Sequence, residues 1–159
     1  ILGFFTGGRD EVLAMVDEAL APVAGLGPFT HVNAPVVGTD NYDFMMQGIG
    51  NLVGNQESAN YGPNYHARSD TFDKVDLRQL KLNAAIAAAV TLGFANMEIT
   101  YTRQTRADLD RLIETTDLQQ QMEMFGLWEA WVAGTRGLSD VVSPAPSSSR
   151  SSPHTSLQP

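Results

Sequence analysis

Apolar and polar positions in the first part of the chain alternate between strand-like runs and helix-like spacing. The run Ile1–Thr6 is short and apolar, which predicts a buried strand, and Gly7-Gly8 follows as a turn. Apolar residues recur at helical spacing over Glu11–Leu20, where Asp10 is placed to cap a helix. The β-branched residues of Thr30–Val37 predict a second strand. Strands separated by helices indicate an α/β fold with helices packed on the faces of a sheet.

The middle of the chain combines two short elements with a long loop. The pattern predicts a short helix over Phe44–Gly48 and another strand over Ile49–Val53, although Gly50 disfavours the strand. Residues Asn55–Val75 are polar and show no periodicity. Loops of this length often carry function, so the search for chemistry starts here.

The second half of the chain is predicted to be helical. Asp76, with Gln79 three residues later, has the form of a helix start, and apolar residues follow at helical spacing to about Tyr101. A further helix is predicted over Asp117–Val132, whose Met and aromatic stripe we interpret as core. From Ser143 to Pro159, 11 of 17 residues are Ser or Pro, a composition that predicts a disordered tail. The pattern divides the chain into a part with strands and helices at 1–104, a helical extension at 105–138 and the tail at 139–159.

Composition and charge narrow the classes of function. The chain has 159 residues, enough for one domain with a core. A net charge of −8 argues against nucleic acid, because a phosphate-binding surface needs clustered Lys and Arg. There is no cysteine, so any metal must be held by His, Asp or Glu. No apolar run is long enough to span a membrane, and the opening inside an apolar run predicts truncation at the N-terminus.

Among the three histidines, His66 is the candidate metal ligand. It lies in the long polar loop, four residues before Asp70. Imidazole binds zinc well, and a nearby carboxylate can hold its other nitrogen. The alternative is a surface histidine, with Asp70 capping the turn that follows. Spacing alone favours this alternative.

Asp40 is the second candidate, because it follows the predicted strand Thr30–Val37. Open α/β sheets bind ligands at the carboxyl ends of their strands, where a carboxylate can orient a metal ligand or hold a substrate amine. The alternative is an N-cap for a helix over Asn41–Gly48, and taken alone the cap is the better interpretation. The segment Gly7–Asp10 also joins a strand to a helix, but it lacks the spacing of a phosphate loop.

Together and in this order, the two segments resemble the M28 family of co-catalytic zinc exopeptidases. The first segment is Thr39-Asp40-Asn41-Tyr42-Asp43-Phe44, with Gly48 four residues after the aromatic residue. The second is His66-Ala67-Arg68-Ser69-Asp70-Thr71, followed by the helix that starts at Asp76. The Gly-Thr-Asp form is most similar to the branch that contains plasma glutamate carboxypeptidase. The resemblance covers roughly residues 1–100 and implies part of a mixed sheet flanked by helices. It makes the part at 1–104 the C-terminal part of a peptidase catalytic domain.

The resemblance also implies two zinc ions that activate water to hydrolyse small peptides or dipeptides. By that resemblance His66 is the last zinc ligand, Asp40 a carboxylate that orients a ligand or substrate, and Asp70 a brace for the His66 loop. The other ligands and the general base have no counterpart in this chain, and Asn41 stands where many members have His. We therefore expect a fragment, inactive as given, of a secreted or periplasmic enzyme. A receptor-like or scaffold relative, a single-zinc acyltransferase of the glutaminyl-cyclase type, and a homodimer stay open.

Overall fold

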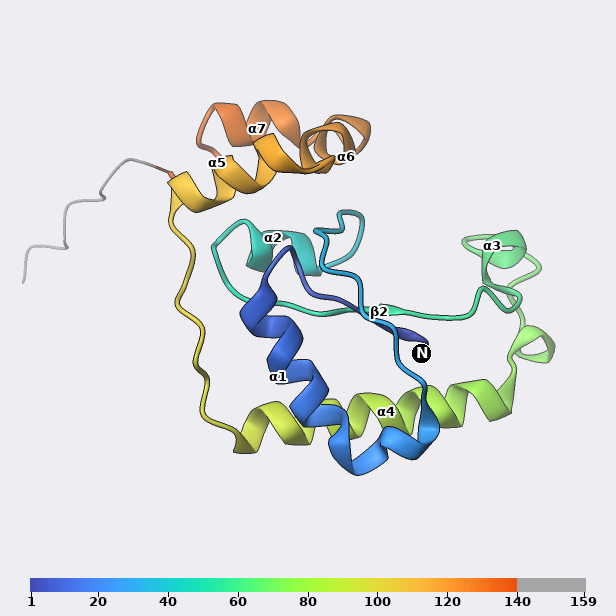
Figure 1. Cartoon of the computed structure of the whole chain (residues 1–159). Coiled ribbons are helices and arrows are strands. Elements are labelled where there is room, and N and C mark those ends of the chain that lie inside the picture. Colours follow the sequence, from blue (N-terminus) through green and yellow to red (C-terminus); the bar gives the residue numbers. More distant parts are fainter. Residues whose placement is uncertain (140–159) are drawn as a thin grey trace, which may run out of the picture.

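A computed structural model describes residues 1–139 as a helix-rich chain with one small sheet (Figure 1). The predicted tail therefore lies outside the described residues, apart from Ser139. None of the helices described is long and apolar enough to cross a membrane. In chain order the elements are β1 (Gly3–Phe5), α1 (Asp10–Leu20), the 3-10 helix η1 (Ala21–Leu26), α2 (Asn41–Met45), β2 (Val53–Asn55), α3 (Tyr61–Asn64), the 3-10 helix η2 (Phe72–Lys74), α4 (Leu77–Asn96), α5 (Arg106–Thr115), α6 (Leu118–Met124) and α7 (Trp128–Val132).

The strand β1 is hydrogen-bonded to a neighbouring segment on each of its two edges. It pairs antiparallel with β2, in a register that places Phe4 opposite Gly54. On its other side, the chain around Val32 runs parallel to it, and the Val32 N–H donates to the Phe4 carbonyl at 2.9 Å. Sheet and helices therefore combine as predicted at the coarse level, with an antiparallel two-stranded sheet and one parallel bridge beside it.

Two strand predictions were misplaced. The predicted strand Thr30–Val37 is reduced to the bridge at Val32, because the Ala34 N–H, the next donor along the ladder, bonds back to the Val32 carbonyl at 2.9 Å instead of to β1. The strand predicted over Ile49–Val53 starts only at Val53. The Ile49 N–H instead closes the turn after α2 by donating to the Phe44 carbonyl at 3.1 Å, so the following residues reach β1 later than their apolar pattern predicts.

A first core forms where α1 and α4 cross beneath the sheet (Figure 1). Its buried residues come from β1, the neighbouring α1 and the distant α4: Phe4, Val16, Leu20, Ile86 and Val90. The helix predicted over Glu11–Leu20 is confirmed, but Asp10 does not cap it. Arg9 occupies the N-cap position, and Asp10 is the first helical residue, whose carboxylate accepts a hydrogen bond from Asn33.

The long helix α4 starts where the sequence predicts and ends earlier. The Asp76 carboxylate accepts the Gln79 N–H at 3.0 Å, which satisfies one of the free donors at the helix start. The helix ends at Asn96 rather than near Tyr101, because Met97 takes an extended conformation. Residues 97–105 then run without a helix or strand from α4 to α5 (Figure 1).

The helical extension contains three short helices. The single helix predicted over Asp117–Val132 was wrong: it is broken into α6 and α7 around Gly126, whose φ of +67° is left-handed and ends the first helix. The helix α5 had no separate prediction, although Thr105 and Asp108 form a capping box that signals its start.

These helices share a second core with α2. Its buried residues are Val37, Tyr42, Met45, Met46, Leu109, Leu112, Ile113, Leu118, Met122 and Trp131. The Leu138 N–H also donates to the Met46 carbonyl at 2.9 Å. Because four core residues come from positions 37–46, the extension at 105–138 packs on the preceding part of the chain through a continuous apolar contact.

Candidate functional site

His66 lies on the exposed loop between β2 and α4. Its φ of +55° is left-handed, an uncommon conformation for a residue other than glycine. The imidazole packs against the Tyr65 ring with centroids 4.0 Å apart, and Tyr65 packs against Tyr61 at 4.8 Å. Among residues 1–139 neither imidazole nitrogen is engaged in a hydrogen bond, so both are available to a ligand.

Asp70 holds the His66 loop through its backbone. The Asp70 N–H donates to the Ala67 carbonyl at 3.1 Å, which closes the turn directly after His66. Its carboxylate makes no hydrogen bond to His66 in the described part of the chain, and instead faces a hollow between α3 and the start of α4. Tyr61, Tyr65 and Lys74 line the same hollow, whereas His66 does not.

Asp40 is exposed at the start of α2. It occupies the N-cap position, but its side chain makes no capping hydrogen bond. Its neighbour Asn41 is held firmly, because its amide donates to the Val36 carbonyl at 3.0 Å and to Asn51 Oδ1 at 3.1 Å. Asp40 lines a second hollow with Phe44 and other residues of α2 and the following segment.

The two motif segments lie apart in the molecule. The helix α2, which follows Asp40, and α3, which precedes His66, occupy different sides of Figure 1 with β2 between them. No three His, Asp or Glu side chains among residues 1–139 lie close enough to hold one metal ion.

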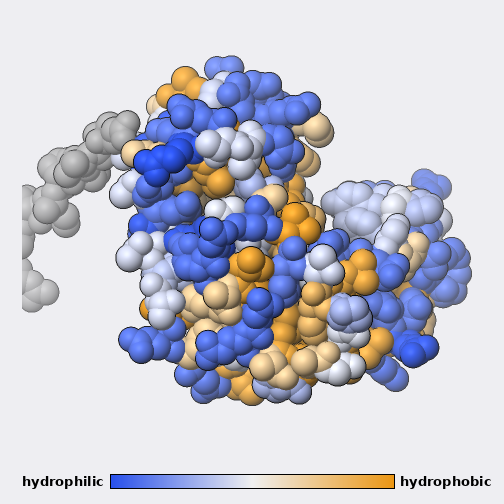
Figure 2. All heavy atoms as spheres, viewed as in Figure 1, coloured by the Kyte–Doolittle hydropathy of each residue, from blue (hydrophilic) through white to orange (hydrophobic). Residues whose placement is uncertain are grey.

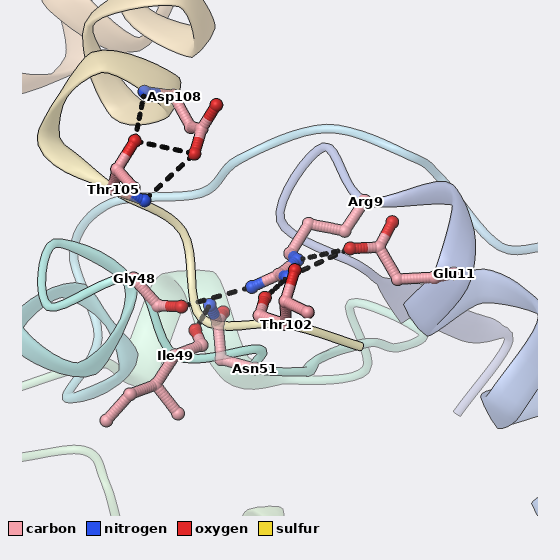
Figure 3. Close-up of polar contacts among 8 residues, drawn as sticks. All are labelled: Arg9, Glu11, Gly48, Ile49, Asn51, Thr102, Thr105 and Asp108. Carbon is pink, nitrogen blue, oxygen red and sulfur yellow. Dashed lines mark hydrogen bonds and ion pairs between the residues drawn. The ribbon is translucent and has the colours of Figure 1, made fainter. Parts of the chain in front are cut away.

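Among residues 1–139 the most buried charged side chain is that of Arg9, which the sequence did not single out (Figure 3). It is only 3% exposed, and its guanidinium donates to the Gly48 carbonyl at 3.1 Å and to the Thr102 carbonyl. It also bonds the Glu11 carboxylate, at 2.9 Å from Nη2, and lies 4.6 Å above the Tyr101 ring. Arg9 thus joins three segments that are distant in the sequence.

The surroundings of Arg9 indicate a structural role. A polar hollow beside it is lined by both signs of charge, from Arg9, Glu11, Asp108 and Arg111 among others. Burial would raise the pKa of the Glu11 carboxyl, but its own backbone N–H and the adjacent Arg9 outweigh that effect and lower the pKa. Because the guanidinium donors are already used by protein acceptors, Arg9 is poorly placed to bind an anion.

His31 is a second histidine with a structural place. Its Nδ1 accepts the Phe4 N–H at 3.1 Å, and its buried ring stacks on Phe4 with centroids 6.0 Å apart. Nε2 lies 3.2 Å from the Asp17 carboxylate, but its N–H is not aimed at that oxygen and stays without a hydrogen bond among residues 1–139. The His31 side chain therefore satisfies a backbone donor of β1. The sequence could not predict this contact, because His31 has no partner residue nearby in the chain.

Comparisons of the chain with protein-family models, with curated proteins and with solved structures find no match. A functional assignment therefore depends on the motif residues and their surroundings. The structure presents His66 on an exposed turn, closes the following turn by a backbone hydrogen bond from Asp70 to Ala67, and leaves Asp40 as an exposed carboxylate in a separate hollow.

Two carboxylates that accept hydrogen bonds from other side chains make the stability of the fold sensitive to acid. Arg136 donates to both carboxylate oxygens of Asp43, at 2.7 and 2.8 Å, and these bonds lower the pKa of Asp43. Hydrogen bonds from Thr105 likewise lower the pKa of Asp108. A lowered pKa means that the folded state binds protons less readily than the unfolded state, so acidification favours unfolding.

We expect the melting temperature to change little between neutral pH and about pH 5, and to fall as the pH drops through about 4. Asp43→Asn should reduce the stability near neutral pH and remove part of this acid sensitivity, because it removes one of the groups that titrates. Thermal unfolding followed by circular dichroism from pH 7 to pH 3 measures both effects. An Asp43→Asn profile parallel to the wild-type profile would contradict the assignment.

Proposed function

We propose that this chain belongs to the catalytic domain of a zinc-dependent exopeptidase of the M28 type that hydrolyses small peptides. The observation that carries the proposal is His66, which lies on the exposed turn that leads to the capped helix α4, with neither ring nitrogen hydrogen-bonded to any of residues 1–139. In the proposed enzyme His66 is a zinc ligand. The remaining ligands and the general base lie in sequence outside these 159 residues.

Two side chains support His66 in this proposal. Asp70 keeps the turn closed through its backbone hydrogen bond to Ala67. Asp40 is an exposed carboxylate beside the apolar side chains of Phe44 and Leu52, a setting suited to the amino group of a small peptide. The fixed Asn41 amide holds the backbone next to Asp40 in place.

The strand arrangement supports the finer proposal of a mixed sheet. β1 has an antiparallel neighbour in β2 and a parallel one at Val32, so both kinds of pairing meet on one strand. α1 and α4 pack together below this strand through Phe4. In the proposed enzyme the sheet continues with further strands, and helices cover both of its faces.

The test uses the longer protein that this proposal implies, loaded with zinc. We expect about two zinc ions per chain by elemental analysis, and hydrolysis of dipeptides or aminoacyl amides. His66→Ala should lower the zinc content and reduce activity by roughly 100-fold or more, because even the loss of an outer partner of a metal ligand costs 10–100-fold. His154→Ala, a histidine outside both motifs, is the matched control and should behave as wild type.

Each other outcome has a defined meaning. A longer protein with neither zinc nor hydrolysis would overturn the proposal and favour a receptor-like or scaffold relative. One zinc ion with cyclisation of N-terminal glutamine would favour an acyltransferase of the glutaminyl-cyclase type. If His66→Ala kept its zinc content but lost much of its stability, His66 would be a structural residue.

A further inference from the structure

The hollow between α3 and the start of α4 has the size of a site for one side chain. All the residues that line it come from the stretch 56–83, and it encloses about 210 Å³. Pockets for drug-sized molecules enclose about 300–1,000 Å³, so this hollow suits a smaller group. In Figure 2 the surface around α3 projects on the right, as α3 does in Figure 1, and it is largely blue and pale. The polar surroundings favour a charged or polar ligand.

The charges at this hollow favour a cation. Glu57, Asp70 and Asp76 line it, and the Asp76 carboxylate is already used to cap α4. Lys74 also lines it, but its ammonium group is paired with Asp73. Among residues 1–139 no group donates a hydrogen bond to the carboxylate of Glu57 or of Asp70. Two carboxylates are therefore left to pair with a positively charged ligand.

Two tyrosines make the hollow suitable for an organic cation. The rings of Tyr61 and Tyr65 lie 4.8 Å apart, and the residues are 58% and 53% exposed. Partial desolvation, the Tyr65 side chain and the charge of Asp70 raise the pKa of Tyr61, so its hydroxyl stays protonated at neutral pH. Aromatic faces attract cations, and a flat guanidinium group also stacks on them. Leu80, which is 52% exposed, adds apolar surface for an alkyl stem.

Asn64 supplies a buried acceptor at the same place. The residue is only 9% exposed and lines the hollow. Its Nδ2 donates to the Asn60 carbonyl at 2.6 Å, which fixes the amide group. Its Oδ1 accepts no hydrogen bond from residues 1–139, and a buried acceptor without a donor is costly. A guanidinium group carries five N–H donors in one plane, so it can serve a carboxylate and this amide oxygen together.

We propose that this hollow binds the guanidinium group of an arginine side chain in a peptide. The guanidinium group stacks on the tyrosine pair, forms an ion pair with Asp70 and donates to Asn64 Oδ1, while the alkyl stem packs on Leu80. Since the aromatic and ionic contacts are partly exposed, one side chain binds weakly, with Kd on the order of 1–10 mM. His66 does not line the hollow, so the proposal is independent of the zinc chemistry.

Nuclear magnetic resonance of the isotope-labelled whole chain tests the site without zinc and at constant ionic strength. The probe is N-acetyl-arginine methylamide, whose only charge is the guanidinium group. We expect chemical-shift changes concentrated in residues 56–83, with Kd on the order of 1–10 mM. N-acetyl-citrulline methylamide has nearly the same shape without the charge and should bind at least about 10-fold more weakly. Agmatine is a free alkylguanidinium, and binding about 10-fold tighter than that of the peptide-like probe would overturn the assignment to a peptide.

Three variants test the roles of the side chains. Asp70→Asn removes the charge, keeps the backbone bond to Ala67, and should weaken binding of the arginine probe by roughly 5–10-fold. Tyr61→Leu removes one ring and should weaken it by roughly 3–5-fold. Glu114→Gln, at an exposed position of α5, is the matched control and should leave Kd unchanged. Circular dichroism checks that the variants are folded.

Three results would each overturn the proposal. The first is equal binding of the arginine and citrulline probes to the wild-type chain, a comparison that needs no variant. The second is a set of chemical-shift changes centred outside residues 56–83. The third is an Asp70→Asn variant that is folded and binds the arginine probe with the wild-type Kd.

Discussion

Replacing Arg9 by methionine is expected to lower the free energy of unfolding by about 3–5 kcal/mol. The guanidinium is the donor for the Gly48 and Thr102 carbonyls, and it lies over the Tyr101 ring. Methionine keeps an unbranched side chain against Tyr101 but leaves the buried Gly48 carbonyl and the partly buried Thr102 carbonyl without this donor. Because a domain is stabilised by only about 5–15 kcal/mol, this one substitution removes a large part of the total.

Urea denaturation followed by circular dichroism measures this effect. Arg111→Met is the matched control, because the Arg111 side chain is 70% exposed and its ion pair to Asp108 is 3.5 Å long. Exposed ion pairs contribute about 0–1 kcal/mol, so the control should lie close to wild type. Arg9→Lys should fall between the two, since an ammonium group cannot reach all the acceptors of the fork. Equal stability of the Arg9→Met and Arg111→Met variants would show that the contacts of Arg9 with the three segments do not stabilise the fold.

Truncation of Trp131 to alanine should have the other large effect, a loss of about 3–5 kcal/mol. Trp131 is 1% exposed in the core that α2 shares with the C-terminal helices. Arg106 stacks on its ring at 3.5 Å, and Gly137 lies so close to the ring that an added Cβ would come within 2.7 Å of it. Alanine would leave a cavity and remove the ring on which Arg106 rests.

Trp128 offers a built-in comparison three residues earlier. It is the other tryptophan of the chain and is only partly buried at the edge of the same core, so Trp128→Ala should cost clearly less. In that variant, fluorescence of the remaining Trp131 reports on unfolding directly. If both truncations had the same cost, Trp131 would not be the centre of the second core.

Short-range features of the fold were predictable because neighbouring residues encode them. The apolar run at Ile1–Thr6 contains β1, the apolar spacing up to Leu20 matches α1, and Asp76 caps α4 as its spacing to Gln79 predicts. The ends of elements were less predictable. Gly126 breaks the C-terminal helix, and this break depends on how the following turn packs rather than on the apolar period alone.

In the candidate site, too, the local features were predictable and the long-range arrangement was not. The residue types and spacing of His66 and Asp70 pointed to one loop, and the structure places them on one turn. Whether Asp40 lies near that loop depends on strand order, and the described chain keeps the two apart. Strand order depends on pairing between distant residues, which leaves no local pattern in the sequence.

By itself, the sequence determined the main helices, the first strand and the residues with chemical potential, because helical period, capping and residue type are local properties. Only the tertiary structure revealed that Arg9 joins Glu11, Gly48 and Thr102, that His31 serves β1, and that α4 keeps an exposed apolar face. The physical reason is that burial and hydrogen-bond partners depend on segments up to 93 residues apart, whose meeting is decided by packing of the whole chain.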